Sequence, residues 1–214
     1  MEFGLNSILT FLICYLIGSF PTGYLFVKTS HRKDLTKEGS GNVGTLNAVT
    51  VSGSKLIGVL VLVFDFLKGA VPVFLLAGVF NEDVITLYIA SIFLILGHNF
   101  PVWLKFKGGR GLATGAGIFA VLNYWVLISW CLVWILLKLF KQDVLISNFI
   151  ATLFLPAAAV ILNLLNIQTT ISIVSPSGAN LFVIFIICIS MLVIIRHTEI
   201  LTKIFPASAK NFNK

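Results

Sequence analysis

The segment KLIGVLVLVFDFLKGAVPVFLLA, residues 55–77, decides the fold class of this 214-residue chain. It is an almost continuous apolar run, and about 20 such residues form an α-helix that crosses a bilayer. Comparable segments cover residues 5–27, 84–100, 112–122, 125–137, 144–165 and 180–195. These runs predict an all-α, polytopic membrane protein. A β-barrel would instead need alternating segments of about 10 residues, which are not present.

Composition supports the same class of protein. Hydrophobic residues make up 58% of the chain and charged residues only 11%, whereas a soluble domain carries roughly 25% charged residues. A chain this short cannot cover a water-exposed surface with so few charges. Cys14, Cys131 and Cys188 all lie within apolar runs, which predicts buried, reduced thiols.

The net charge of +7 is distributed as a membrane protein would have it. The Lys and Arg residues fall mainly in four clusters, separated by pairs of apolar segments. Because basic loops stay in the cytoplasm, this order predicts seven transmembrane helices, an external N-terminus and a cytoplasmic C-terminus. Glu82 and Asp83 then lie outside. The basic residues form no extended face with interleaved aromatic side chains of the kind that binds single-stranded nucleic acid, so we expect no nucleic-acid partner. Residues 1–214 are expected to form a single membrane domain.

One boundary has two interpretations. Residues 112–137 form either two short spans around Asn123 and Tyr124 or one broken, over-long helix. A single helix would place the basic cluster at Lys138 outside, so the charge rule favours two.

Two spans contain features that a simple lipid-facing helix does not need. Gly18–Gly23 interrupts the first span, and Pro21 removes a backbone donor and kinks the helix. This interruption is either a packing kink or a wall of the functional site. Asp65 and Lys68 share one helical face at i, i+3 spacing, and charges within a span usually face a partner or a cavity.

The first polar loop, Gly39–Gly44, reads G-x-G-x-x-G. The dinucleotide-binding fingerprint has this spacing, but it requires a βαβ unit that is missing here. Closely spaced glycines still allow backbone amides to turn inward as an anion nest, and a following helix start would favour an anion. Ser40 and Asn42 can add donors. The alternative is a flexible interhelical loop.

The second polar loop, Lys107–Gly111, is rich in cations. Lys105, Lys107 and Arg110 accompany three glycines, and an Arg side chain can bind phosphate in bidentate fashion. Orientation in the membrane explains Lys105, but it does not explain three glycines. Gly115 and Gly117 are better interpreted as helix-packing positions.

His98 ends a span and precedes the cationic loop, and His197 begins the tail. Either His is a hydrogen-bonded structural residue or a proton carrier near neutral pH. No metal-ligand cluster is found, and no cofactor is expected. Two phosphate-binding loops beside a lipid-facing cavity indicate chemistry between a phosphorylated compound and an acyl or lipid group. The alternative is transport of a phosphorylated solute.

The motifs also resemble those of the bacterial acyl-phosphate:glycerol-3-phosphate acyltransferases of the PlsY type. The matching residues appear in family order: Gly18-Ser19-x-Pro21-x-Gly23-Tyr24, Gly39–Gly44 with Asn47, Asp65-x-x-Lys68-Gly69, Gly97-His98-x-x-Pro101, Phe106–Gly109 with Gly111, Ala113 and Thr114, and Arg196-His197. They extend from the first span to the tail.

The resemblance implies seven spans and transfer of a fatty acyl group from acyl phosphate to the sn-1 hydroxyl of glycerol 3-phosphate, giving lysophosphatidic acid. It implies a monomeric, multi-pass enzyme of the bacterial cytoplasmic membrane, with acyl phosphate, glycerol 3-phosphate and membrane lipids as partners. The catalytic candidates are His98, Lys107, Arg110 and His197. The substrate-binding candidates are Ser40, Gly41, Asn42, Gly44, Asn47, Lys68, Gly108, Gly109, Gly111, Thr114 and Arg196. A substrate phosphate oxygen can act as the base in such enzymes.

Three positions depart from the family pattern. Thr50 stands where the first motif has Arg, Arg110 where the second has Lys, and Ile200 where the tail has Asn. Loss of one charge-assisted bond to phosphate costs about 1.5–3 kcal/mol, unless Arg32, Lys55 or Arg110 compensates. A diverged paralogue with another acceptor or low activity is therefore the alternative to the family reaction.

Overall fold

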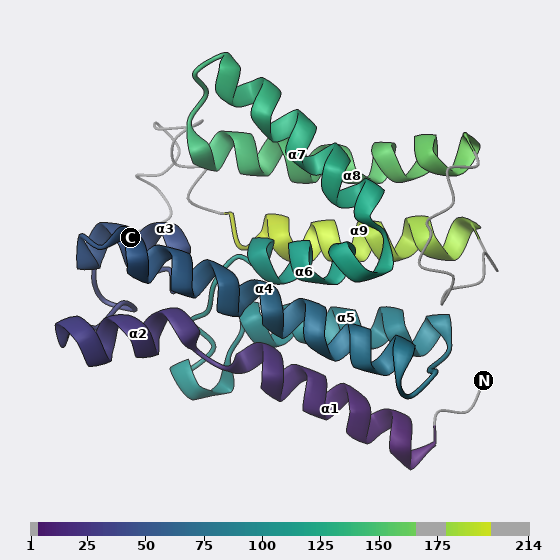
Figure 1. The fold of residues 1–214 in the computed structure, drawn as a ribbon, viewed down its shortest axis with the longest axis horizontal. Coiled ribbons are helices and arrows are strands. Elements are labelled where there is room, and N and C mark those ends of the chain that lie inside the picture. Colours follow the sequence, from purple (N-terminus) through teal and green to yellow (C-terminus); the bar gives the residue numbers. More distant parts are fainter. Residues whose placement is uncertain (1–3, 166–178, 198–214) are drawn as a thin grey trace, which may run out of the picture. The chain divides into compact units, whose positions relative to one another are not determined.

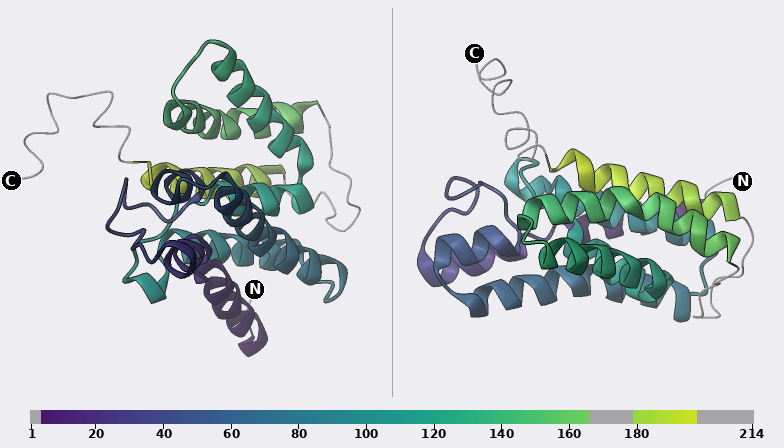
Figure 2. Two further views of the ribbon diagram at one scale, coloured as in Figure 1. Left: turned by 60° about the vertical axis from the view of Figure 1, so that its left-hand side comes forward. Right: turned by 90° about the horizontal axis from the view of Figure 1, so that it is seen from above.

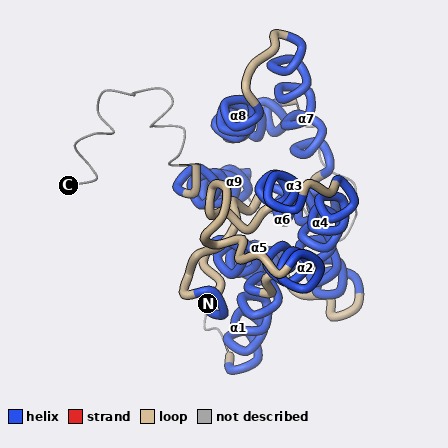
Figure 3. Tube along the Cα trace, turned by 90° about the vertical axis from the view of Figure 1, so that its left-hand side faces the viewer, coloured by secondary structure: helices blue, strands red, loops and turns tan. Residues whose placement is uncertain are grey.

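The computed structural model describes residues 4–165 and 179–197, and every regular element within these ranges is helical (Figures 1 and 3). The described residues form two compact units, residues 4–124 and residues 125–165 with 179–197. The first unit contains α1 (Leu5–Ser19), α2 (Thr22–His31), α3 (Thr45–Ser52), α4 (Lys55–Gly78), α5 (Val84–Asn99), the 3-10 helix η1 (Val102–Leu104) and α6 (Leu112–Leu122). The second contains α7 (Tyr124–Leu139, from Trp125 onward), α8 (Val144–Leu164) and α9 (Ala179–Ile195). The expected all-α class is confirmed.

Within the described residues, four helical segments are long and apolar enough to cross a membrane: Leu5–His31, Lys55–Gly78, Val84–Leu104 and Val144–Leu164. Shorter apolar helices cover Leu112–Leu122, Tyr124–Leu139 and Asn180–Ile195. Each apolar segment of the sequence is therefore helical. Large apolar side chains on α4, including Leu62, Val63 and Phe74, are exposed, as expected where a helix faces lipid rather than water.

The first span is broken at Phe20 and Pro21, and the chain changes direction between α1 and α2 (Figure 2). Proline cannot donate a backbone hydrogen bond, so α1 ends before it and α2 begins at Thr22. The predicted interruption is confirmed.

Two glycines allow α1 and α5 to pack with their backbones in contact. A Cβ atom at Gly18 would lie 2.1 Å from the Leu94 carbonyl oxygen, and one at Gly97 would lie 2.1 Å from a carbonyl oxygen of α1. A side chain at either position would force the helices apart. This contact holds the end of α1, with Ser19, against the end of α5, with His98.

The packing of α4 against α6 follows the same rule. A Cβ at Gly69 would lie 2.1 Å from the Thr114 carbonyl oxygen, and one at Gly117 would lie 2.0 Å from the Phe66 carbonyl oxygen. Helix packing is therefore confirmed as the role of Gly117. A Cβ at Gly115 would make only an ordinary 3.8 Å contact with a methyl group of α5, so the packing interpretation does not hold there.

The chain between α6 and α7 is not one continuous helix. Asn123 has φ −161° and ψ 87°, which interrupts the helical hydrogen bonds. Residues 112–139 thus form two helices, α6 and α7, and the expectation that each of them crosses the membrane stays a prediction.

The polar stretch between the first two spans is folded rather than loose. Its own helix, α3, follows the first glycine loop, as expected for that loop. The stretch contributes to a buried apolar cluster with α2 and α4, made of Val27, Leu35, Val43, Ala48, Val51, Ile57 and Val61. This cluster fixes the first loop against the helices that carry the site.

In the second unit, two tryptophans join α7 to α8. Trp130 Nε1 donates to Thr152 Oγ1 at 3.1 Å, and Trp134 Nε1 donates to Asn148 Oδ1 at 2.8 Å. The two indole rings stack with centroids 6.4 Å apart. Residues 166–178 and the tail after His197, including Ile200, lie outside the described residues.

Candidate active site

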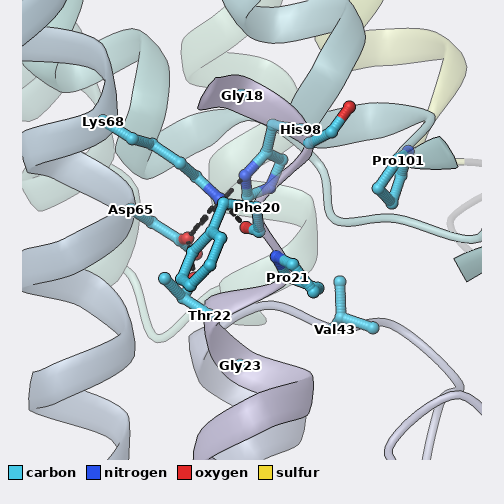
Figure 4. A pocket seen from close by; sticks show the side chains of 11 residues that line it. Gly18, Phe20, Pro21, Thr22, Gly23, Val43, Asp65, Lys68, His98 and Pro101 are labelled. Carbon is cyan, nitrogen blue, oxygen red and sulfur yellow. Dashed lines mark hydrogen bonds and ion pairs between the residues drawn. The ribbon is translucent and has the colours of Figure 1, made fainter. Parts of the chain in front are cut away.

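The centre of the candidate site is an ion pair within α4. Lys68 Nζ lies 2.8 Å from Asp65 Oδ1, and the two side chains are only 9% and 3% exposed. The Thr22 hydroxyl donates to the same carboxylate oxygen, and Lys68 Nζ donates to the Phe20 carbonyl oxygen at 3.0 Å (Figure 4). The predicted i, i+3 pair is confirmed. It also makes hydrogen bonds to Phe20 and Thr22, at the helix interruption between α1 and α2.

His98 extends this network from the end of α5. Its Nδ1 lies 3.2 Å from Thr114 Oγ1 and 3.9 Å from Asp65 Oδ1. The His98 ring is 6% exposed, and Thr114 is completely buried. Thr114 therefore contacts the imidazole and orients it, a role that its sequence position did not reveal.

The cationic loop packs directly on His98. The Gly109 amide donates to the His98 carbonyl oxygen at 3.0 Å. A Cβ at Gly109 would lie 2.0 Å from His98 Nε2, and one at Gly108 would lie 2.2 Å from the His98 carbonyl oxygen. Two of the loop's glycines are thus explained by close approach to this histidine. The structure brings the loop and His98 together, as their sequence proximity suggested.

The loop presents its cations unequally. Lys105 and Lys107 are exposed, and Arg110 is half-buried. Gly111 has a φ of +81° and caps the start of α6, a conformation that glycine adopts without strain. The loop therefore offers positive charge toward solvent while its glycines hold it on α5.

The first glycine loop has a different internal structure from the one predicted. Gly39 and Gly41 adopt positive φ angles of 61° and 72°, so its glycines are needed for the turn. However, the amide of Ser40 donates to Asn47 Oδ1, that of Gly41 to a loop carbonyl, and that of Gly44 to Asn42 Oδ1. In the described conformation these amides stabilise the loop instead of forming an open anion nest.

Asn47 is the residue that holds this loop in shape. Its side chain is 4% exposed, and Nδ2 donates to the carbonyl oxygens of Leu35, Glu38 and Asn42 at 3.3, 3.0 and 2.8 Å. Asn42 is also buried, whereas Ser40 is exposed. Ser40 is thus the loop residue with an accessible hydroxyl.

A small pocket lies where these parts meet (Figure 4). Its free volume is about 10 Å³. The first loop contributes Val43, α4 contributes Asp65 and Lys68, and α5 and its extension contribute His98 and Pro101. The remaining lining comes from Gly18, Ser19, Phe20, Pro21, Thr22 and Gly23. The interruption of the first span is therefore a wall of the pocket and not only a packing kink.

Arg196 and His197 belong to the second unit, where they follow α9. His197 Nδ1 lies 2.8 Å from the Val193 carbonyl oxygen. Their assignment as candidate site residues remains a prediction. Within the described residues, no group of three His, Cys, Asp or Glu side chains is arranged to hold a metal ion.

Three pocket residues with polar side chains were absent from the candidates proposed on sequence: Ser19, Thr22 and Asp65. Asp65 carried a signal, because a carboxylate within a span is costly without a partner. For Ser19 and Thr22 the only signal in the sequence was the helix interruption around Pro21. Their burial depends on how α1 packs against α5, which the sequence does not show.

This fold and site define a helical membrane protein with a buried polar pocket beneath a cationic loop. The family model for glycerol-3-phosphate acyltransferase matches residues 8–207. A glycerol-3-phosphate acyltransferase of Ehrlichia canis (strain Jake) is 34% identical over 193 residues, which are 90% of this chain and 92% of that protein. One of Bartonella henselae is 38% identical over 156 residues, 72% of this chain and 74% of that protein.

Two crystal structures of PlsY, an integral membrane glycerol 3-phosphate acyltransferase, share this fold. Its glycerol 3-phosphate form has a TM-score of 0.76 and 30% identity, covering 98% of this chain and 100% of that chain. Its lysophosphatidic acid form has a TM-score of 0.74 and 31% identity, covering 94% and 92%. The chain belongs to the glycerol-3-phosphate acyltransferase family, and it is a membrane protein of the PlsY type.

Proposed function

We propose that this protein transfers a fatty acyl group from acyl phosphate to the sn-1 hydroxyl of glycerol 3-phosphate, giving lysophosphatidic acid for phospholipid synthesis. Its single strongest support is the packing of Gly109 on His98, which holds the cationic loop beside the Asp65–Lys68 pocket. The cations suit the phosphates of both substrates, and the exposed apolar helices suit an acyl chain that lies in lipid.

The reaction needs positioning more than it needs a protein base. The sn-1 hydroxyl oxygen attacks the acyl carbonyl carbon, and the carbonyl electron pair moves onto its oxygen. Return of that pair breaks the bond to the phosphate, which leaves as inorganic phosphate with the hydroxyl proton. A phosphate oxygen of the substrate accepts this proton in our proposal.

The candidate residues fall into two groups. Some contact the substrate, and the others hold the two loops in place. We assign Lys107, Arg110 and the Ser40 hydroxyl to the phosphate groups, because these side chains are exposed or half-buried at the loops. Gly108, Gly109 and Gly111 hold the second loop in place, and Gly41, Asn42, Gly44 and Asn47 hold the first.

His98 is enclosed by Thr114, Asp65 and Gly109. We therefore assign it to orientation of the cationic loop, with Thr114 fixing its ring. Lys68 lies at the pocket and faces the acyl group. Arg196 and His197 remain candidates for the phosphate site from the second unit.

The proposed topology has seven spans, an external N-terminus and a cytoplasmic C-terminus in the bacterial cytoplasmic membrane, with a monomer as the active unit. Cysteine labelling tests it in a variant that lacks the three native cysteines. Glu82→Cys should react with a membrane-impermeant maleimide in intact cells, and Lys141→Cys only after permeabilisation. Equal labelling of both in intact cells would refute the topology.

The activity is tested with purified protein, palmitoyl phosphate and glycerol 3-phosphate, measuring released phosphate. Release that depends on glycerol 3-phosphate is expected, with strong losses in Lys107→Ala and Ser40→Ala. Glycerol and other polyols, supplied in place of glycerol 3-phosphate, test for a different acceptor. Turnover with one of these alone would identify a diverged paralogue and overturn our assignment.

The departure at Thr50 has a local counterpart in the structure. Thr50 is exposed on α3, and Lys33 Nζ donates to the adjacent Val51 carbonyl oxygen at 2.8 Å. Lys33 thus places a cation near the end of α3 where the family has Arg. The double change Thr50→Arg with Arg110→Lys measures the consequence. A steep rise in kcat/KM would identify the natural chain as a weakened enzyme, and a fall would indicate that Lys33 and Arg110 already supply the required charge.

A further inference from the structure

Ser19 has an unusual environment for a buried serine. Its side chain is completely buried, and its Oγ has no hydrogen-bond partner among the described residues. Burying a hydroxyl without a partner is costly, and native structures rarely leave one in this state. Ser91 on α5 is equally buried, but its Oγ donates to the Leu87 carbonyl oxygen at 2.7 Å. The Ser19 hydroxyl is therefore buried without a partner, whereas the Ser91 hydroxyl is hydrogen-bonded.

The residue that carries this hydroxyl is part of the pocket lining. Ser19 is the last residue of α1 and lines the pocket with Lys68 and His98. The contact of Gly18 with α5 fixes its position, because no side chain separates the two backbones. Figure 4 shows Lys68 and His98 together with Gly18 and Phe20, which are the chain neighbours of Ser19.

The charge of the pocket decides which part of a substrate it can take. Asp65 neutralises Lys68, so with His98 counted as neutral the described pocket carries no net charge. A phosphate dianion gains little there and is better served by the exposed cations of the second loop. An ammonium has three donors, and the contacts of Lys68 with Asp65 and the Phe20 carbonyl use two. The third N–H of Lys68 and the O–H of Ser19 are two donors that suit a neutral oxygen which becomes negative during the reaction.

The size of the pocket points to the same group. Its free volume of about 10 Å³ is close to the minimum of roughly 10–15 Å³ that one water molecule needs. A carbonyl oxygen is of this size. A phosphoryl group, with four oxygens around phosphorus, is larger than the space that one water-sized group occupies there.

We propose that the pocket is an oxyanion site, in which Ser19 Oγ–H donates to the carbonyl oxygen of the acyl donor. This inference rests on the proposed acyl-transfer function. As the acceptor oxygen bonds to the carbonyl carbon, the π pair moves onto the carbonyl oxygen, where Ser19 and Lys68 stabilise it. The pair then reforms the carbonyl as the bond to phosphate breaks and inorganic phosphate departs.

The test compares Ser19→Ala with the matched control Ser91→Ala, which also removes a buried hydroxyl from the first unit. Loss of one oxyanion donor lowers kcat by about 100- to 1,000-fold. Ser19→Ala should therefore show this fall in kcat with an unchanged KM for glycerol 3-phosphate, and Ser91→Ala should not. Ser19→Cys keeps the side-chain size with a weak donor, so it should fold like the wild type and still lose kcat.

Two further measurements separate the possible failures. Inhibition by inorganic phosphate should be unchanged in Ser19→Ala; weaker inhibition with normal kcat would place Ser19 in the phosphate site and overturn the proposal. A bound acyl phosphonate, which does not turn over, should show a lower carbonyl stretching frequency in the wild type than in Ser19→Ala. Equal frequencies, or equal kcat in the two serine variants, would also overturn it. A wild type without acyl transfer would instead refute the proposed function, and the phosphonate spectrum would still test the hydroxyl.

Discussion

Gly109 of the cationic loop packs closely on the His98 ring. A methyl group at position 109 would have to occupy space only 2.0 Å from His98 Nε2. Either the ring or the loop must then move, and both belong to the site.

We predict that Gly109→Ala lowers the stability by about 1–3 kcal/mol, the usual cost of overpacking, and greatly reduces activity. The matched control is Gly78→Ala at the end of α4, where an added Cβ meets nothing within 4 Å; it should be neutral or slightly stabilising. Thermal unfolding in detergent and turnover measure the two effects. Equal behaviour of the two variants would show that the loop does not rest on His98.

The chain also contains two Asp-x-x-Lys pairs in very different surroundings. Asp65–Lys68 is buried, whereas Asp34–Lys37 has a separation of 3.7 Å and a lysine that is 80% exposed. Removing one partner of a buried pair costs about 3–5 kcal/mol, and an exposed pair contributes about 0–1 kcal/mol.

Lys68→Met should therefore lower the unfolding temperature strongly, because it leaves Asp65 buried without its cation, and Lys37→Met should hardly change it. Both are measured by thermal unfolding in the same detergent. The interpretation of the buried pair fails if Lys68→Met is as stable as Lys37→Met.

At the residue scale, the sequence predicted which charged groups pair, but it did not predict which neighbours surround the polar side chains. The pairing of Asp65 with Lys68 followed from helical spacing and the cost of charge in a membrane. The roles of Thr114, Asn47 and Ser19 did not follow, because each depends on a neighbour that only tertiary packing supplies. Asn47 is the clearest case, since its side chain satisfies carbonyls of three other residues instead of facing a ligand.

At the scale of elements, the helix ends follow from local chemistry. Asp83 begins α5, and its Oδ1 accepts from the amides of Ile85 and Thr86 at 2.8 and 3.2 Å. Asp143 starts α8 in the same way. Of the two acidic residues between the second and third apolar segments, Asp83 is thus the N-cap of α5.

Asp83 should make stability depend on pH. Its hydrogen bond with the Thr86 hydroxyl, more than those with backbone amides, lowers the pKa of Asp83 below its ordinary value of 3.8. A carboxyl whose pKa is lower in the folded state stabilises the fold above its ordinary pKa, and this contribution is lost as the pH falls through the folded value.

We predict that Asp83→Ala costs about 1 kcal/mol at pH 7, as for other N-caps, and that its difference from the wild type shrinks below pH 3.8. Thermal unfolding at several pH values measures this difference. A gap that stays constant down to acid pH would contradict the assignment of the charged cap.

The second unit has an element-scale interaction of its own, the tryptophan pair of α7 on α8. A double-mutant cycle with Trp134→Phe and Asn148→Ala should give a coupling energy of about 0.6–1.7 kcal/mol, the range for hydrogen bonds between membrane helices. Trp130→Phe with Asn148→Ala is the control, because Trp130 donates to Thr152 instead. A coupling no larger than that of the control would show that the indole bond contributes nothing.

Element prediction succeeded in the apolar runs and failed in the polar stretch between the first two of them. The helices of the apolar segments and the break at Pro21 were predicted from residue types. The extent of the buried cluster around α3 was missed, because Leu35, Val43 and Val51 are scattered in a polar stretch and meet only after folding.

At the scale of the whole molecule, the chain separates its chemistry from its lipid surface. Exposed apolar side chains cover α4, while the polar network of the first unit gathers the end of α1, the middle of α4 and the end of α5. The class of protein was predictable from composition, because so few charges exclude a soluble fold. The assembly of the pocket residues at one place was not predictable. It requires the close packing of α1 on α5 at Gly18 and Gly97, and these helices are far apart in the sequence.

The central claim is that this chain acylates glycerol 3-phosphate at the site formed by the cationic loop and the pocket. The most direct measurement is mass spectrometry of the lipid product from purified protein, palmitoyl phosphate and glycerol 3-phosphate. We predict lysophosphatidic acid acylated at sn-1, in amounts equal to the released phosphate, and little product from Lys107→Ala. Phosphate release at the same rate without glycerol 3-phosphate, or an acyl chain on any other acceptor, would contradict the claim.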